Sequence, residues 1–495
     1  MKLYDLTIVE IRDGLKAGKF TVVELVESLI KRAEEFKHLN VFVTETFNQA
    51  RERAVELDKQ IVAGEISDKN LAGVVVGMKD IFCTKGVKTT ACSNILENFV
   101  PQYESTASQK MLDNGAIFLG KTSLDQFAMG SSNKTSAFGN VLNPYKDTSR
   151  PEKDLVPGGS SGGTAAGVAA GIFPGGTATD TGGSVRQPAA LCGIVGLKPT
   201  YGRVSRWGII AYSSSLDTPS TMARTVKDAA ILLDGMAGHD EKDSTSAPVE
   251  TPCFENACNA DGSVEGLRIG IPAEYIEGLN GGMKELLDSH IEDLKSRGAE
   301  IVEISLPHTK YALPAYYIIS PAEASANLAR YDGVRYGHRT EKDVESLADM
   351  YSKTRSEAFG EEVKKRIMIG TAVLSAGFYD AYFIKAGRVR RLITQDFEKA
   401  YEKCDVILTP TTTGGAFATD DKLSAIDMYL NDVYTVSINL AGLPAISIPA
   451  GLNKNGLPLG LQYIGKKYDE EGILKVASVS EKIIGFDNRP SKFDK

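Results

Sequence analysis

Two serines and a lysine are the residues of this sequence whose surroundings suggest chemistry. Ser184 stands in DTGGSVRQPAA (180–190), where two glycines precede it and no histidine lies nearby. A serine hydroxyl is a weak nucleophile until a neighbouring base takes its proton. Ser160 and Ser161 lie in a second glycine-rich run, PGGSSGGTAAG (157–167). The question is which group could activate Ser184.

Lys79 is the candidate base. It follows the run VVVGM (74–78), typical of a buried strand, and precedes Asp80. A lysine in such a place often extends its charge to the surface. If it is buried instead, desolvation lowers its pKa, and the neutral amine can act as a general base. A second serine could then carry the proton between Lys79 and Ser184.

The run at 157–167 also has less specific interpretations. It could be a flexible turn, because glycines permit many backbone conformations, or a helix start that holds an anion. It continues into TAAGVAAG (164–171), a small-residue helix. That continuation favours glycines packed tightly against another segment.

A Ser-His-Asp triad is the main rival explanation for Ser184, since triads are assembled in space rather than in sequence. The sequence contains no G-x-S-x-G motif, however. Each histidine stands in a polar or loop-like context, which favours solvated surface positions. The five histidines are His38, His239, His290, His308 and His338.

Other motifs match known sites only in part. GAIFLGKT (115–122) fits the G-x-x-x-x-G-K-[ST] pattern of phosphate-binding loops, but its apolar centre predicts a strand with no room for such a loop. The single DTG at 180–182 lacks the second carboxylate that an aspartic protease needs. Cys253 and Cys258 have no evident partners for a metal ion, so we expect no metal site.

The elements that must position these residues follow an α/β pattern, in which helices alternate with short apolar strands. Capping boxes at 7–10 and 21–24 each start a helix. We expect a polar, irregular stretch at 239–265 and mostly helix at 310–400. The other predicted helices lie near 47–62, 282–297 and 470–484, and the predicted strands lie within 71–82, 116–120, 193–197, 267–272, 299–307, 406–410, 445–449 and 457–465.

We predict a single large domain over residues 1–495, because there is no internal repeat and no proline- or serine-rich linker. Within it, the catalytic core is expected at about 65–235 plus 400–465. A helical segment at about 282–400 is expected to form the substrate pocket.

The composition narrows the class of protein. The chain of 495 residues has a formal net charge of −8, so it is not expected to wrap nucleic acid by its own charge. Six scattered cysteines fit reduced thiols. The sequence begins without a signal peptide and has no apolar run of 18 residues, so we expect a cytoplasmic protein.

Lys79, the GGSSGG run and the 24-residue step from Ser160 to Ser184 together resemble the amidase signature family. The resemblance implies a Ser–cis-Ser–Lys triad, in which Ser184 is the nucleophile, Ser160 the bridging serine on a cis peptide bond, and Lys79 the base. It also implies a central twisted mixed β-sheet covered by helices on both faces.

The resemblance further implies an oxyanion hole made by backbone N–H groups of Thr181, Gly182, Gly183 and Ser184. Such donors are each typically worth roughly 10²–10³ in rate. Glycines at 182 and 183 would let a substrate carbonyl approach without meeting a Cβ atom.

Four longer runs resemble those family members that release ammonia from glutamine for tRNA-dependent amidotransferases. The resemblance implies that free glutamine is hydrolysed to glutamate and ammonia. The ammonia would pass to an activated glutamyl-tRNA(Gln) on a partner, the B subunit. The runs are MGSSNKTSAFGNVLNP (129–144), GLKPTYGRVSRWGIIAYSSSLD (196–217), YYIISPAEASANLARYDGVRYG (316–337) and FGEEVKKRIMIGT (359–371).

The same resemblance implies the partners and cofactors. The B and C subunits of such an amidotransferase would form a complex with this chain. ATP and Mg²⁺ would belong to the B subunit, with no cofactor in this chain. Whether aspartyl-tRNA(Asn) is also served is left open.

The resemblance also implies a pocket for the two charged groups of glutamine. Arg366 in KKRIM would bind the α-carboxylate, a task suited to guanidinium, and Asp432 in MYLNDVYT would bind the α-ammonium. Ser131 and Tyr317 match further polar contacts, with Tyr316 as the alternative to Tyr317. From their residue types alone, Arg366 and Asp432 could equally be surface charges.

Two other functions remain open. A stand-alone amidase of the same family would act on another small amide and would need no pair of charged residues for its substrate. A scaffold without activity would need none of Lys79, Ser160 and Ser184.

Overall fold

The computed structural model describes residues 2–66, 69–259, 263–279, 281–422 and 432–486. A sheet of 11 strands runs through this part of the chain, in the order β1-β3-β2-β4-β6-β5-β10-β11-β9-β7-β8. The strands are β1 (Phe42–Glu45), β2 (Val75–Lys79), β3 (Ile117–Thr122), β4 (Gly175–Asp180), β5 (Val195–Lys198), β6 (Thr218–Ala223), β7 (Arg268–Pro272), β8 (Glu300–Ile304), β9 (Val406–Pro410), β10 (Ala445–Leu452) and β11 (Pro458–Ile464).

The sheet is mixed, as expected. β2 is parallel to both β3 and β4, and β7 is parallel to both β8 and β9. Between these two parallel groups, the neighbouring strands from β4 to β9 pair in antiparallel fashion. Although several consecutive strands are neighbours in the sheet, β5 pairs with β10, where Lys198 lies opposite Ala445, so segments distant in sequence meet near its centre.

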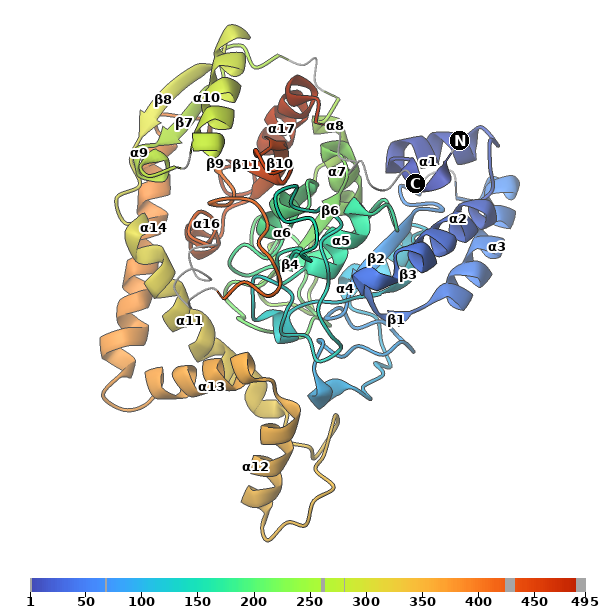
Figure 1. Cartoon of the computed structure of the whole chain (residues 1–495), viewed down its shortest axis with the longest axis vertical. Helices are drawn as coiled ribbons and strands as arrows, with labels where there is room; N and C mark the ends of the chain where they lie inside the picture. The colour runs from blue at the N-terminus through green and yellow to red at the C-terminus, as the bar shows by residue number, and fades with distance from the viewer. Residues whose placement is uncertain (1, 67–68, 260–262, 280, 423–431, 487–495) are drawn as a thin grey trace.

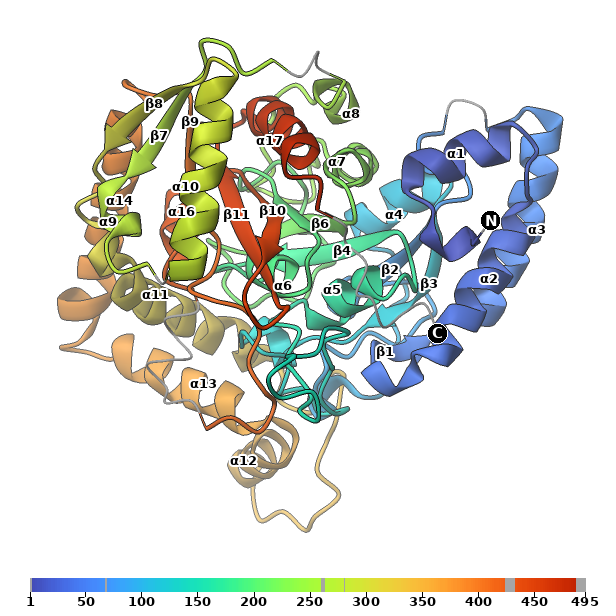
Figure 2. The ribbon, with the colours of Figure 1, turned by 45° about the horizontal axis from the view of Figure 1, so that its top comes forward.

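Helices cover both faces of the sheet (Figure 2). Val76 and Met78 of β2 pack into a core shared with α7 and α17, whereas Val75 packs into a second core with α2, α3 and α5. The longer helices are α1 (Ile8–Lys16), α2 (Val22–Glu35), α3 (Phe47–Ala63), α4 (Thr106–Asp113), α5 (Gly162–Ala169), α7 (Val226–Asp234), α10 (Gly281–Ser296), α11 (Ala312–Asn327), α12 (Leu347–Ala358), α13 (Glu361–Val373), α14 (Lys385–Ala400) and α17 (Glu470–Ile484). The shorter ones are α6 (Arg186–Leu191), α8 (Phe254–Ala257), α9 (Ala273–Ile276) and α16 (Val436–Ala441).

The two ends of the sheet have different neighbours. Helices α1 to α3 lie at the end formed by β1, and α9, α10 and α14 lie at the end formed by β7 and β8 (Figures 1 and 2). Helices α11 to α14 form the helical stretch predicted at 310–400, and α12 projects from the body of the molecule (Figure 1). The division into a catalytic core and a pocket segment stays a prediction.

Most of the predicted elements are confirmed. Thr7 and Thr21 cap α1 and α2, each in a reciprocal pair of hydrogen bonds with the glutamate three residues later. The sequence patterns did not predict β1, β4 (GGTATD) or β6 (TPSTMA). β1 has only four residues, and neither β4 nor β6 has the large or alternating apolar residues of an ordinary strand. Both β4 and β6 are wholly buried, and their small residues let helices approach closely.

No helix within the described residues has the length and apolar composition needed to cross a lipid bilayer.

Candidate active site

Lys79, the last residue of β2, lies at the centre of the candidate site. Its side chain is completely buried. Its Nζ atom lies 3.0 Å from Ser160 Oγ, 2.7 Å from Ser161 Oγ and 2.9 Å from Thr179 Oγ1. The structure thus brings together a lysine and serines that are about 80 positions apart in the sequence. The alternative of a lysine extended to the surface is wrong.

Burial lowers the pKa of Lys79 to about 7, because the protein interior disfavours the charged ammonium. The carboxylates of Asp125, Asp180 and Asp217 act in the opposite direction and limit the shift. A large fraction of Lys79 is therefore neutral at neutral pH, which is the form that can accept a proton.

The run at 157–167 is neither exposed nor a loose turn. Ser160 and Ser161 are fully buried, and the peptide bond between Gly159 and Ser160 is cis. A Cβ atom at Gly159 would lie 2.1 Å from Asp125 Oδ2, so only glycine fits there. Tight packing of these glycines, as the small-residue helix α5 suggested, is confirmed.

Ser184 lies in the turn that connects β4 to α6. Its side chain is 8% exposed, and its hydroxyl has no hydrogen-bond partner within the described part of the chain. The backbone N–H of Ser161 donates to the carbonyl oxygen of Ser184 at 3.3 Å. The turn that carries Ser184 therefore lies directly beside the pair Ser160 and Ser161.

Asp180 holds the backbone of this turn. Its carboxylate accepts the N–H of Gly183 at 2.8 Å and the N–H of Val185 at 3.2 Å. Arg186 pairs with the same carboxylate at 3.0 Å, and both side chains are fully buried. Burial is the largest single effect and would raise the pKa of Asp180, but the charge and hydrogen bonds of Arg186, together with Lys198 and Asn439, outweigh it and hold that pKa at about 2. A carboxylate ionised at any working pH thus shapes the turn.

The four predicted oxyanion donors are not equivalent in the structure. The Gly183 N–H is already bonded to Asp180. The N–H groups of Thr181, Gly182 and Ser184 have no protein acceptor among the described residues. The ring of Tyr316 lies against Gly182, where a Cβ atom would be 2.7 Å from the ring carbon Cζ.

Arg366 on α13 is buried and held from two sides. Its Nε donates to Glu362 Oε1 at 2.8 Å, and its Nη1 donates to Tyr212 Oη at 2.6 Å. A guanidinium has five N–H groups, so three remain, one on Nη1 and two on Nη2. Nη2 has no acceptor among the described residues. The end of the guanidinium that binds a carboxylate in bidentate fashion is therefore free.

Asp432 is buried close to Arg366. Burial raises the pKa of Asp432 to about 8, and the charge of Arg366 offsets only part of this effect. A carboxyl group in this state gains most from a ligand that brings a positive charge.

The remaining predicted residues lie around the same site. The centre of the Tyr317 ring is 5.5 Å from the Arg366 guanidinium and 5.0 Å from the Tyr316 ring, which is nearly perpendicular to it. Ser131 is buried, and its carbonyl oxygen accepts a hydrogen bond from Gln187 at 3.0 Å. Tyr316 contacts the turn before Ser184, and Tyr317 contacts Arg366, so the choice between them stays open.

Sequence reasoning did not single out several residues that organise the site, namely Thr179, Asp180, Asp217 and Tyr212. A signal existed for Asp180, which directly precedes Thr181 and the two glycines before Ser184. Thr179, Asp217 and Tyr212 act through contacts that only the fold creates.

The motif that resembles a phosphate-binding loop lies in a strand beside this site and contributes none of its predicted residues. Residues 117–122 of GAIFLGKT are strand β3, which confirms that no phosphate-binding loop forms there. Lys121 is buried, and its Nζ donates to Phe82 O at 2.6 Å and to Thr89 Oγ1 at 2.7 Å.

One histidine prediction is wrong, because His290 is buried rather than solvated. Its Nε2 lies 2.8 Å from Tyr463 Oη and 3.2 Å from Ser480 Oγ, in the core between α10, α17 and β11. Burial lowers the pKa of His290 to about 4, so it is neutral. Its neighbours are core residues, and Ser184 is not among them.

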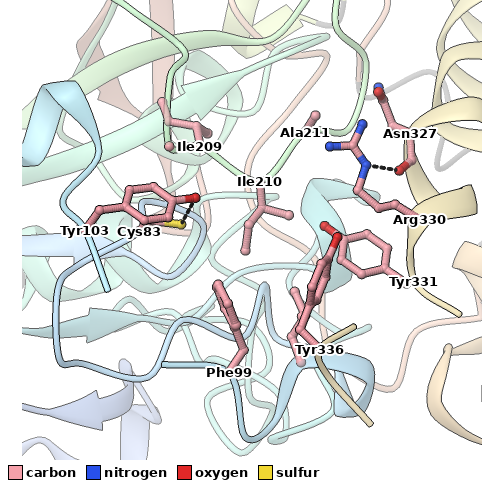
Figure 3. A pocket seen from close by; sticks show the side chains of 12 residues that line it. Cys83, Phe99, Tyr103, Ile209, Ile210, Ala211, Asn327, Arg330, Tyr331 and Tyr336 are labelled. Atoms are coloured by element: carbon pink, nitrogen blue, oxygen red, sulfur yellow. Dashed lines mark hydrogen bonds between the residues drawn. The ribbon is translucent and has the colours of Figure 1, made fainter. Parts of the chain in front are cut away.

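A cavity of about 390 Å³ lies near the site but does not include it (Figure 3). Phe99, Tyr331 and Tyr336 contribute aromatic walls, and the Nε of Arg330 donates to Asn327 O at 2.8 Å. Neither Lys79 nor the serines line it.

Taken together, a buried lysine, a cis-linked serine and a partly accessible serine in a glycine turn define a serine-dependent amide hydrolase. The chain belongs to the amidase family, whose model matches residues 24–474.

Relatives with closely similar sequences carry a more specific name than the family does. The chain is 55% identical to the A subunit of the glutamyl-tRNA(Gln) amidotransferase of Sphingopyxis alaskensis, over 99% of both chains. It is 56% identical to the protein of the same name from Paramagnetospirillum magneticum, also over 99% of both.

Solved structures agree. The crystal structure of the A subunit of the glutamyl-tRNA(Gln) amidotransferase from Thermotoga maritima is similar at a TM-score of 0.75 and 36% identity, covering 97% of this chain and 95% of that one. The native peptide amidase from Stenotrophomonas maltophilia is similar at a TM-score of 0.83 and 28% identity, covering 99% of both.

Proposed function

We propose that this chain is the glutamine-hydrolysing subunit of a tRNA-dependent amidotransferase. Relatives of that name are 53–56% identical to it over nearly their whole length. The observation that carries the proposal is a buried pair of groups, the free end of Arg366 and the carboxyl of Asp432, close to the turn that carries Ser184: the Thr435 hydroxyl contacts the carbonyl oxygens of both Asp432 and Gly182. A free α-amino acid has the matching pair of charges.

Glutamine would bind with its α-carboxylate on Nη1 and Nη2 of Arg366 and its α-ammonium on Asp432. Ser131 and Tyr317 would supply further polar contacts to the bound glutamine. The side-chain amide then reaches the turn that carries Ser184. The ammonium restores the charged form of Asp432, which burial alone disfavours.

In the first half of the reaction, Ser184 Oγ attacks the amide carbon of the glutamine side chain. Its proton passes to Ser160, and the proton of Ser160 passes to the neutral Lys79. The N–H groups of Thr181, Gly182 and Ser184 stabilise the oxyanion, while Asp180 keeps the Gly183 N–H in place. Lys79 returns the proton through Ser160 to the leaving nitrogen, which departs as ammonia and leaves a glutamyl ester on Ser184.

In the second half, water attacks the ester carbon. The proton of the water follows the same route to Lys79 and is returned to Ser184 Oγ as the ester bond breaks. Glutamate is released and the enzyme is restored. The net reaction converts glutamine and water into glutamate and ammonia.

The ammonia would pass to the B subunit, a partner that holds the activated glutamyl-tRNA(Gln), in a complex completed by the C subunit. ATP and Mg²⁺, which activation of the tRNA-bound carboxylate requires, would bind to the B subunit. We place the complex in the cytoplasm, where aminoacyl-tRNA is used. If the complex also amidates aspartyl-tRNA(Asn), that reaction would use the same ammonia.

A stand-alone amidase is the second candidate, favoured by the higher TM-score with the peptide amidase. Arg366 separates the two. A neutral amide substrate gains nothing from a guanidinium that binds a carboxylate, so Arg366→Ala would leave its turnover intact. The same substitution should raise the KM for glutamine by at least about 100-fold, the loss expected for a charge-assisted bidentate pair.

The proposal is tested by co-purifying the chain with its partners and measuring amidation that depends on both glutamine and glutamyl-tRNA(Gln). We expect ammonia release from glutamine that is lost in Ser184→Ala and in Lys79→Ala. Wild-type rates in either variant would contradict the assigned roles. Amidation with added ammonium chloride should survive both substitutions, which shows that the complex itself is intact.

A further inference from the structure

Tyr212 connects two parts of the site, the guanidinium of Arg366 and the turn that carries Ser184. Its side chain is 1% exposed. Its hydroxyl accepts a hydrogen bond from Arg366 Nη1 at 2.6 Å and donates one to Ser320 Oγ at 2.9 Å. The Arg366 guanidinium also lies 5.6 Å from the centre of the Tyr212 ring. Tyr212 therefore holds the guanidinium from one side, while Glu362 holds it from the other.

Asp217 anchors the backbone of Tyr212 to the oxyanion turn. The Tyr212 N–H donates to Asp217 Oδ2 at 2.9 Å, and the hydroxyl of Thr181 donates to Asp217 Oδ1 at 2.7 Å. Thr181 is the first residue of the turn that carries Ser184. A single buried carboxylate thus joins the loop of Tyr212 to the backbone that would stabilise the oxyanion.

A second set of contacts links the Tyr212 hydroxyl to the oxyanion turn. Ser320 Oγ donates to the carbonyl oxygen of Tyr316 at 2.8 Å. The Tyr316 ring lies against Gly182, within the oxyanion turn. Two routes therefore run from Tyr212 to the same turn, one from its backbone N–H through Asp217 and one from its hydroxyl through Ser320.

The opposite side of this loop faces the cavity of Figure 3. Ala211 lines that cavity, as does Asn327, whose Nδ2 donates to the Tyr212 carbonyl oxygen at 3.2 Å. Since the cavity leaves this side of the loop only partly packed, the hydrogen bonds to Asp217 and Asn327 determine its position.

We propose that Tyr212, anchored by Asp217, sets the distance between the guanidinium of Arg366 and the oxyanion turn, and so selects glutamine by its length. The inference rests on the proposed function. Asparagine is one methylene shorter than glutamine. With its carboxylate bound to a fixed guanidinium, its amide would fall short of Ser184. Tyr212 is a positioning residue and does not touch the reacting atoms.

The decisive variant is Tyr212→Phe, which keeps the ring and removes only the hydroxyl. We expect the KM for glutamine to rise about tenfold, as for the loss of one hydrogen bond to a charged group. The ratio of kcat/KM for glutamine to that for asparagine should fall by about tenfold, within the range that one methylene is worth. Propionamide, which has no carboxylate, should be hydrolysed at the wild-type rate.

The measurements use the full chain co-purified with its partners, and asparagine is assayed both as a substrate and as a competitive inhibitor of glutamine hydrolysis. Tyr463→Phe is the matched control, because it removes a buried tyrosine hydroxyl that contacts His290 and Ser480 instead. It should leave the KM for glutamine and the discrimination unchanged.

Asp217→Asn should act differently, because Asp217 also holds Thr181. We expect a lower kcat on glutamine and propionamide alike. Tyr212→Phe should thus change mainly the KM, whereas Asp217→Asn should change mainly kcat. A general loss of packing would not separate the two effects, and thermal melting of both variants would reveal such a loss. Should Asp217→Asn fail to fold, Tyr212→Phe alone decides.

If Tyr212→Phe keeps both the glutamine KM and the discrimination against asparagine, the inference is wrong. If it slows glutamine and propionamide equally, Tyr212 has only a structural role, and the inference is again wrong. A wild-type complex that cleaves propionamide but not glutamine would instead overturn the proposed function.

Discussion

At the scale of single residues, the proposed chemistry depends on the neutral amine of Lys79. A histidine can act as a base at neutral pH without a large pKa shift, since its ordinary pKa is already near 7. A lysine must be buried for its pKa to reach that range. Here the lysine ends a strand that is buried along its whole length. Three nearby carboxylates keep its pKa from falling further. The balance leaves an amine that can both accept a proton and return it.

This balance predicts the pH dependence of turnover. Because only the neutral amine accepts a proton, kcat for glutamine should fall as the pH drops below about 7, the pKa of Lys79. A stopped assay of ammonia release from about pH 5.5 to about 9.5 at saturating glutamine would measure it. A kcat that is constant from about pH 5.5 to 7 would contradict a lysine base.

Asp432 leads to a second prediction at the same scale. Burial raises its pKa from 3.8 to about 8, so the folded protein holds this proton more tightly than the unfolded chain does. The carboxyl group therefore favours folding fully below pH 3.8, and this contribution is lost as the pH rises towards 8. Asp432→Asn, which never ionises, should become more stable relative to wild type across this window.

The measurement is thermal melting of both proteins at pH 5, 6, 7 and 8 without glutamine. Glutamine should raise the melting temperature of wild type but not of Asp432→Asn, because the variant cannot pair with the ammonium. A stability difference that is independent of pH would show that Asp432 does not titrate in this range.

At the scale of elements, the proposed mechanism depends most on the turn between β4 and α6. It must present several N–H groups on one side and the Ser184 hydroxyl beside Ser160. Gly183 makes this possible with φ at +135°, a conformation available essentially only to glycine. A Cβ atom there would lie 2.2 Å from Thr435 Oγ1.

Gly183→Ala should therefore damage the turn without removing any catalytic side chain. We expect kcat to fall by roughly 100-fold or more, as when an oxyanion donor is lost, and stability to fall by about 1–3 kcal/mol. Gly485→Ala is the matched control, because its φ is also positive, at +57°, but nothing lies within 4 Å of the added Cβ atom. Turnover unchanged in Gly183→Ala would show that the turn tolerates a side chain.

For the whole molecule, the buried pair Asp180–Arg186 joins the two halves of the chain. Arg186 donates to Gln462 Oε1 on β11 at 3.1 Å and to Asn439 Oδ1 on α16 at 2.6 Å. Asn439 Nδ2 in turn donates to Asp180 Oδ1 at 2.9 Å. Residues some 250 positions apart are thus held around one ion pair directly beneath the Ser184 turn.

Arg186→Met should destabilise the fold by about 3–5 kcal/mol, because it leaves Asp180 buried without a counter-charge. Chemical unfolding followed by tryptophan and tyrosine fluorescence would measure the change. In the exposed pair Arg391–Glu398, the same substitution, Arg391→Met, should cost less than about 1 kcal/mol. Equal losses in the two variants would show that Asp180 does not depend on Arg186.

Local patterns predicted much of this protein. The capping boxes of α1 and α2, the strand around Val75 and the helical stretch after residue 310 all follow from side-chain spacing, which depends only on neighbours in the chain. The three residues Lys79, Ser160 and Ser184 were singled out one by one from their local sequence, and the resemblance to the amidase signature family joined them into a triad. Strands β4 and β6 were not predicted, because their small side chains carry no periodic signal.

The sequence by itself determined the fold class, the family and the candidate triad, since residue types and short motifs are enough to recognise them. Only the tertiary structure decided the burial of Lys79 and the free end of Arg366. It also decided the links from Asp180 and Asp217 to the oxyanion turn. The physical reason is that a pKa, an open hydrogen-bonding face and a positioned backbone depend on the groups that surround a residue in space. In this sheet β5 pairs with β10, so those groups come from distant parts of the chain.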